Sequence, residues 1–70
     1  MNMKWINEAR RAKGWTQEEM AKKLNISKSG YKKLEYGTNK LTLARFIQIC
    51  SVLNLDAAAT IQEVQKYENY

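Results

Sequence analysis

The stretch Trp15–Lys40, WTQEEMAKKLNISKSGYKKLEYGTNK, decides the fold of this chain. Thr16 offers a hydroxyl at the start of a helical run, and Glu19, three residues later, completes the capping-box pattern Thr-x-x-Glu. This pattern predicts a helix over residues 17–24. Asn25 follows. Asparagine tolerates the left-handed conformation at a helix end better than any residue except glycine. The helix is therefore expected to end there.

A further helix follows directly. Ser27 can cap it, residues 28–36 can form it, and Gly37 can end it. Two helices joined by so short a turn must cross steeply. The sequence therefore predicts a helix-turn-helix arrangement over residues of about 16–36.

The rest of the chain carries helix signals as well. There is no proline, and Gly14 can end a first helix. Thr42 can cap a fourth helix, and Asp56 can cap a fifth over residues 57–67. Apolar periodicity gives these inward positions: Trp5, Ile6 and Ala9; Met20, Ala21 and Leu24; Tyr31 and Leu34; Leu43, Phe46, Ile47, Cys50 and Leu53; Ala57, Ile61, Val64 and Tyr67. The predicted fold is all-α, one compact five-helix domain over residues 1–70.

Charge is distributed unevenly along the chain, whose net charge is +5. Residues 1–40 hold ten Lys and Arg against four Glu, which gives +6. Residues 41–70 hold two basic and three acidic residues, which gives −1. This asymmetry is typical of a protein with one basic face that binds a polyanion, although a lysine-rich surface that only interacts with solvent has the same composition.

The sequence lacks the residues that several classes of function require. The chain has no histidine, no paired carboxylates and no glycine-rich phosphate loop, so we expect no catalytic residue, no metal site, no cofactor and no enzyme activity. The single cysteine, Cys50, precludes an intrachain disulfide and lies in an apolar run, where it is expected to be a small buried hydrophobe. No apolar run approaches the ~18 residues of a membrane span. We therefore expect a cytoplasmic protein without membrane contact.

The helix over residues 28–36 has a polar face. With Tyr31 and Leu34 inward on a wheel of ~100° per residue, the side chains that point outward are Ser29, Lys33 and Tyr36, with Lys32 at the shoulder and Lys28 at the helix N-terminus. Lysine and serine donate hydrogen bonds to guanine and to phosphates, so this face predicts contact with DNA. Glu35 tilts back toward the core and is a candidate for an internal ion pair.

Residues beside this face can contact phosphates. Gln17 is the first residue of its helix, whose N-terminal N–H groups point the same way as its amide. The hydroxyl of Tyr36 lies at the outer helix end. Thr38, Asn39 and Lys40 follow that end and could clamp the DNA backbone. Six to eight such contacts would make binding steeply dependent on salt.

Residues 10–55, RRAKGWTQEEMAKKLNISKSGYKKLEYGTNKLTLARFIQICSVLNL, resemble the lambda-repressor-like, Cro/XRE-type helix-turn-helix domains of bacterial and phage transcription regulators. The matching patterns are Gly14-x-Thr16-Gln17-x-x-Met20-Ala21-x-x-Leu24-x-Ile26-Ser27 and Leu34-Glu35-x-Gly37, and the resemblance covers about Ile6 to Ala59. It implies sequence-specific binding of double-stranded DNA, usually as a homodimer on a palindrome, in a bacterial or phage-encoded regulator.

The resemblance also implies roles for single residues. The residue matching Gln17 contacts phosphate, and Arg10 and Glu35 match a buried ion pair. The positions that read bases correspond to Lys28, Ser29, Lys32 and Lys33. This chain departs from the family pattern at Asn25, where glycine is usual, at Tyr31, where an aliphatic residue is usual, at Gly30 in the first turn of the reading helix, and at Leu41, in the region where a proline is common.

A second function stays open beside DNA binding. The same fold serves in antitoxins and other small regulators that bind a partner protein, and the apolar stripe of the fifth helix could be a dimer seam or a docking surface. Lys22 and Lys23 could contact phosphate or only solvent. Trp15 is expected to pack in the core and not to stack on bases.

Overall fold

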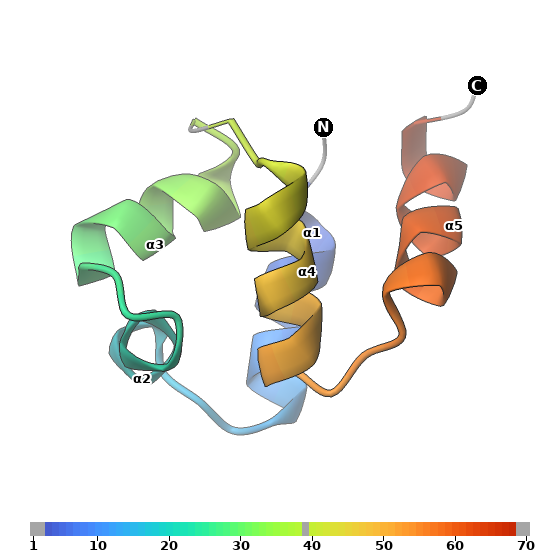
Figure 1. Ribbon diagram of the computed structural model, residues 1–70. Helices are drawn as coiled ribbons and strands as arrows, with labels where there is room; N and C mark the ends of the chain where they lie inside the picture. Colours follow the sequence, from blue (N-terminus) through green and yellow to red (C-terminus); the bar gives the residue numbers. More distant parts are fainter. Residues whose placement is uncertain (1–2, 39, 69–70) are drawn as a thin grey trace.

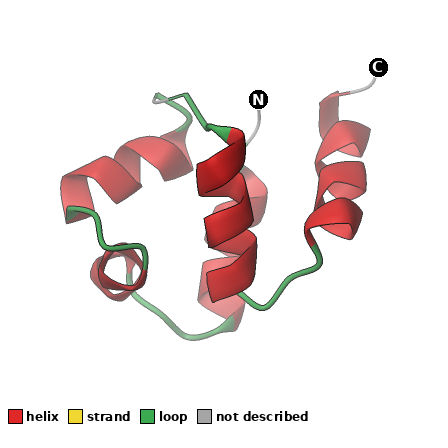
Figure 2. Ribbon diagram, viewed as in Figure 1, coloured by secondary structure: helices red, strands yellow, loops and turns green. Residues whose placement is uncertain are grey.

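Helices make up most of the chain, and the described residues contain no strand. The computed structural model describes residues 3–38 and 40–68, with side chains up to residue 63. The helices are α1 (Lys4–Ala12), α2 (Gln17–Lys23), α3 (Lys28–Tyr36), α4 (Leu43–Val52) and α5 (Ala57–Glu68) (Figures 1 and 2). The prediction of an all-α, five-helix fold is confirmed.

Helices α2 to α5 begin at a capping side chain. An oxygen of each cap accepts a hydrogen bond from the backbone N–H three residues later, at 3.1, 3.0, 3.2 and 3.1 Å for Thr16, Ser27, Thr42 and Asp56. The Thr16 N–H also donates to Oε1 of Glu19 at 2.9 Å, which completes the predicted capping box and lowers the pKa of Glu19. The four predicted caps are confirmed.

Helices α1 to α4 all end with the same backbone conformation. The chain takes a positive φ just after each of them: 76° at Gly14, 58° at Asn25, 75° at Gly37 and 57° at Asn54. Two N–H groups then bond back into the last turn; after α2, Asn25 donates to the Lys22 carbonyl and Ile26 to the Ala21 carbonyl, both at 3.0 Å. This is the Schellman motif, which satisfies carbonyls that a helix end otherwise leaves free. The end at Asn54 was not predicted.

The core forms around Tyr31 of α3, whose side chain is fully buried. It lies in one cluster with apolar side chains from α1, α2 and α4 and from residues next to these helices, Met3, Ile6, Met20, Ala21, Leu24, Ile49 and Leu53. Trp5 of α1 meets Phe46 of α4 edge to face, with 5.6 Å between ring centroids. Cys50 is buried as expected, and burial raises the pKa of its thiol.

The predicted inward face of α4 is partly wrong. Leu43 and Ile47 are 69% and 52% exposed, whereas Ile49, which the prediction omitted, is fully buried beside Phe46 and Cys50. Apolar residues cover more than half of this helix, so two faces fit a helical period equally well. Packing against the core cluster selects the face that includes Ile49.

Helix α5 lies apart from the helix-turn-helix pair. In Figure 1, α4 stands between α2 and α3 on one side and α5 on the other. Helix α5 packs on α4, with Ala57 half-buried. Ile61, predicted to face inward, is only partly covered and remains 40% exposed. The side chains of Val64 and Tyr67 lie outside the described ones. Within the described residues, no helix combines the length and apolarity that a membrane crossing requires.

A buried ion pair joins α1 to α3. Nε of Arg10 lies 2.7 Å from Oε2 of Glu35, and the two side chains are 9% and 2% exposed. Arg10 also donates from Nη1 to the carbonyl of Trp15 at 2.6 Å, which ties the α1–α2 loop to the pair. Oε1 of Glu35 accepts from Nδ2 of Asn7 at 2.9 Å and from Nε2 of Gln17 at 3.1 Å. One carboxylate thus connects α1, α2 and α3.

Stability should fall in acid because of this carboxylate. Burial alone would raise the pKa of Glu35, but the Arg10 hydrogen bond and further donors outweigh it and hold the pKa at about 2. In the unfolded chain the pKa of a glutamate is ~4.3, so the stabilisation by Glu35 is complete above that pH and is lost as pH falls toward 2. We expect the free energy of unfolding, measured by urea titration, to drop by about 3 kcal/mol between pH values of about 5 and 2.

Two variants test the assignment of this acid dependence. Glu35→Gln should lose about 3–5 kcal/mol of stability at neutral pH, because it leaves the Arg10 charge buried without its partner. Glu18→Gln, at an exposed residue of α2, should keep both the neutral stability and the acid dependence of the parent. A Glu35→Gln protein as stable as the parent would show that the pair does not hold the fold.

The left-handed end of α4 gives a second test. Asn54→Ala should cost about 1–2 kcal/mol, because a Cβ without a compensating polar side chain disfavours φ near 57°. Asn54→Gly should be close to neutral, since glycine adopts this conformation without strain. Thermal unfolding followed by circular dichroism compares the two, and equal melting temperatures would argue against the strain.

Candidate nucleic-acid interface

The α2–turn–α3 unit has the geometry that two steeply crossing helices require. Asn25 takes the left-handed conformation, and Ser27 caps α3 directly afterwards. In Figure 1, α2 is seen end-on while α3 runs across the view. Arg45 and Gln48 of α4 support the turn, because Nη1 of Arg45 lies 3.4 Å and Nε2 of Gln48 lies 3.1 Å from the Leu24 carbonyl.

The outer face of α3 is the one that the helical wheel predicts. Tyr31, Leu34 and Glu35 are buried. Exposed side chains on the opposite side are Lys28, Ser29, Lys33 and Tyr36, with Lys32 half-buried at the shoulder. The single acid of α3 is thus inside, and the outer face carries donors only, apart from hydroxyl oxygens that both donate and accept.

Gly30 lies in the first turn of α3, close to the capping residue Ser27. A Cβ at this position would lie 3.1 Å from the Ser27 hydroxyl oxygen, the atom that accepts the Gly30 N–H at 3.0 Å. The same cap bond forms at Glu19, Arg45 and Ala59, which carry side chains, so the cap by itself does not require glycine. Gly30 leaves the side of α3 toward α4 without a side chain.

The segment after α3 contains two described residues that were predicted to contact phosphate, Thr38 and Lys40. Both donors of Thr38 are already used, because its N–H and its hydroxyl donate to the Lys33 carbonyl at 3.0 and 3.2 Å. A phosphate contact from the Thr38 hydroxyl would have to break that bond. Lys40 is exposed. Asn39 lies outside the described residues.

Gln17 begins α2 and is half-buried. Its Nε2 donates one hydrogen bond to Glu35, so its amide is already oriented by the core. The sequence predicted a phosphate contact for Gln17 but neither this bond nor the donor Asn7. No local pattern marks Asn7, because it meets Glu35 across 28 residues of sequence.

Trp15 is half-buried and packs against the core cluster, as expected. The ammonium of Lys23 lies 4.3 Å from the centroid of the Trp15 ring, a cation–π contact. Lys23 therefore covers the ring that could otherwise have stacked on bases. Lys22 is exposed.

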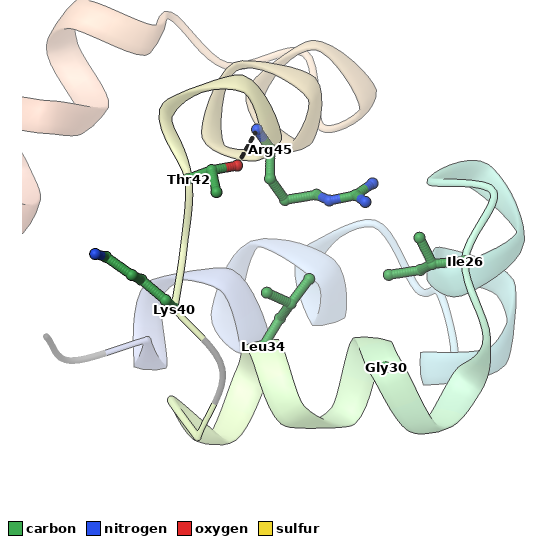
Figure 3. A pocket seen from close by; sticks show the side chains of 6 residues that line it. All are labelled: Ile26, Gly30, Leu34, Lys40, Thr42 and Arg45. Carbon is green, nitrogen blue, oxygen red and sulfur yellow. Dashed lines mark hydrogen bonds between the residues drawn. The ribbon is translucent and has the colours of Figure 1, made fainter.

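A groove of about 310 Å³ separates α3 from the start of α4. Its lining residues are Ile26, Gly30, Leu34, Lys40, Thr42 and Arg45. In Figure 3, Leu34 and Ile26 point into the space, Arg45 extends over it from α4, and the Lys40 ammonium points away from it. The guanidinium of Arg45 is held by Oε1 of Gln48 at 2.6 Å. The groove gives the side of α3 an apolar floor and a basic rim.

Comparison with known proteins agrees with this geometry. A family model described as "Helix-turn-helix" matches residues 6–59. The chain is also similar to a protein of Bacillus subtilis (strain 168) named "Uncharacterized HTH-type transcriptional regulator YqaF". The two are 34% identical over 64 residues, which cover 91% of this chain and 84% of the relative.

No solved structure gives a significant match to the chain. The family match and the relative together support DNA-binding transcriptional regulation. The family model covers most of the chain, including the whole helix-turn-helix unit, and the chain therefore belongs to the Cro/C1-type helix-turn-helix family.

Proposed function

We propose that the protein is a repressor that binds a palindromic operator in double-stranded DNA as a homodimer, each copy forming a single DNA-binding domain over residues 1–70. The outer face of α3 carries this proposal, because it is basic while the one acid of the helix is buried. A helix with such a face fits the major groove, where lysine and serine donate to base edges. Two copies would place their α3 helices about 34 Å apart.

The residues divide into two kinds of contact. Lys28, Ser29, Lys32 and Lys33 would read bases from α3. Gln17, Tyr36, Thr38, Asn39 and Lys40 would contact phosphates at the two sides of the groove. Arg10 and Glu35 would not contact DNA themselves, because both are buried. Regulation of this kind requires no catalysis, cofactor or metal, and its setting would be the cytoplasm of a bacterial cell, with the gene carried by the bacterium or a phage.

The exposed side of α4 supports the dimer. Leu43 and Ile47 lie one turn apart, and both are more than half exposed. Aliphatic side chains so placed are favourable in contact with another apolar surface. A second copy brings the same residues in a two-fold arrangement, and neither residue is charged.

A partner protein is the alternative occupant of this α4 surface. The antitoxin-like function would keep the basic face of α3 and use Leu43 and Ile47, or Ile61 of α5, for a different chain. The homodimer is favoured because its two-fold symmetry also matches the symmetry of a palindromic operator.

Binding-site selection from random duplexes at about 150 mM salt tests the DNA proposal. We expect an enriched palindrome for the parent protein. Lys33→Ala should cost about 1–3 kcal/mol and relax the preference at one position of each half-site, because a base contact is lost. Lys40→Ala should keep the enriched sequence, weaken binding to all duplexes, and flatten the salt slope by about one unit.

The outcomes separate the two functions. An unenriched pool with retained non-specific binding would contradict the operator-binding proposal and favour the partner-protein function. Wild-type affinity in both variants across the salt range would show that the DNA face is assigned to the wrong residues.

The dimer surface has its own test, sedimentation equilibrium at micromolar concentrations with and without the palindrome. The double variant Leu43→Gln/Ile47→Gln should be monomeric and should still bind a half-site, because it leaves charge and the α3 face unchanged. Leu55→Gln, which alters an exposed leucine between α4 and α5, is the matched control and should stay dimeric. A double variant that remains dimeric would exclude these two residues from the interface.

A further inference from the structure

Gln17 faces two directions at once. On one side, its Nε2 lies 3.1 Å from Oε1 of Glu35. On the other side, the residue is partly exposed at the first position of α2. A primary amide has two N–H donors on one nitrogen, and only one can point at the carboxylate. The second N–H is directed away from Glu35.

The chemistry of Glu35 determines which end of the Gln17 amide turns inward. An ionised carboxylate only accepts hydrogen bonds, so the amide oxygen would be repelled from the position that Nε2 occupies. Without such a partner, a glutamine amide can rotate and present either its oxygen or its nitrogen. Glu35 therefore selects one of the two orientations.

The carboxylate is itself held from both of its oxygens. Arg10 binds Oε2 at 2.7 Å, and Asn7 binds Oε1, the oxygen used by Gln17, at 2.9 Å. With its side chain 2% exposed, Glu35 has little room to turn. The position of Oε1, and with it the direction of the Gln17 amide, thus depends on residues of α1.

We propose that Glu35 and Asn7 are positioning residues for DNA: they hold the Gln17 amide so that its second N–H is presented to a phosphate. This inference rests on the proposed function, in which Gln17 contacts phosphate. Neither Glu35 nor Asn7 touches DNA. Their effect on affinity comes from an amide already fixed before binding, so that less conformational freedom is lost when the complex forms.

A double-mutant cycle on DNA affinity tests the proposal. A phosphate contact is independent of sequence, so a random duplex at low salt suffices as the probe. Gln17→Ala should weaken binding about tenfold, and Asn7→Ala about threefold, in line with one lost and one loosened hydrogen bond. In the Gln17→Ala background, Asn7→Ala should have no further effect, because no amide remains to be positioned.

Two further variants separate positioning from folding. If circular dichroism shows that Glu35→Gln is folded, this variant should behave like Asn7→Ala in the cycle. If Glu35→Gln is unfolded, Asn7→Ala still tests the proposal, because it leaves the Arg10–Glu35 pair intact. Gln48→Ala is the matched control, since it removes a half-buried amide that bonds the Leu24 carbonyl outside this network. Its effect should be the same in the parent and in the Gln17→Ala background.

A spectroscopic signature adds a measurement that a merely structural role would not change. In ¹⁵N-labelled protein without DNA, the Gln17 side-chain amide should have a high order parameter, and Asn7→Ala should lower it. Addition of the duplex should shift mainly one of its two proton resonances. A mobile Gln17 amide in the parent would overturn the proposal.

The outcomes distinguish this inference from the proposed function. If the parent binds no duplex, the proposed function fails and the inference fails with it. The inference alone is overturned if the parent binds DNA, but Asn7→Ala weakens binding equally in the parent and in the Gln17→Ala background, or has no effect in either.

Discussion

The carboxylate of Glu35 is the point at which the first three helices meet. A buried charge is costly unless it is paired and its remaining hydrogen-bonding capacity is used. Here Arg10 neutralises the charge, while Asn7 and Gln17 bond the second oxygen. Because Arg10 also binds the Trp15 carbonyl, the loop before α2 is tied to the same centre. Satisfying this one group constrains the orientation of the helix-turn-helix unit relative to α1, together with the packing of the core cluster.

That arrangement also determines the sign of the charge on the outer surface of α3. With its only acid turned inward to Arg10, α3 presents lysines and hydroxyls outward. The interaction that stabilises the fold thus also removes a negative charge from the face proposed to meet DNA. In the C-terminal half, which is close to neutral, the chain carries an exposed apolar pair on α4 in place of charge, which suits contact with protein and not with a polyanion.

Helix boundaries in this domain are set by local chemistry. A side-chain oxygen starts each of α2 to α5, and a glycine or asparagine with positive φ ends each of α1 to α4. Such signals act over a few residues, so they were predictable, including the box at Thr16 and the ends at Asn25 and Gly37. Asn54 follows the same rule, but no end was predicted for α4 from the sequence.

The sequence by itself determined the starts of α2 to α5 and most helix ends, the all-α fold, and the sides of α3 that face the core and the solvent. These features depend on residues three or four positions apart, and such spacings can be read directly from one sequence. The tertiary structure decided which apolar face of α4 is buried, because that helix has two faces of similar period and only packing selects between them. It also decided the bonds to Glu35 from Asn7 and Gln17, which span 28 and 18 residues. Contacts across such separations leave no periodic trace in the sequence, because they arise only when α1, α2 and α3 have packed together.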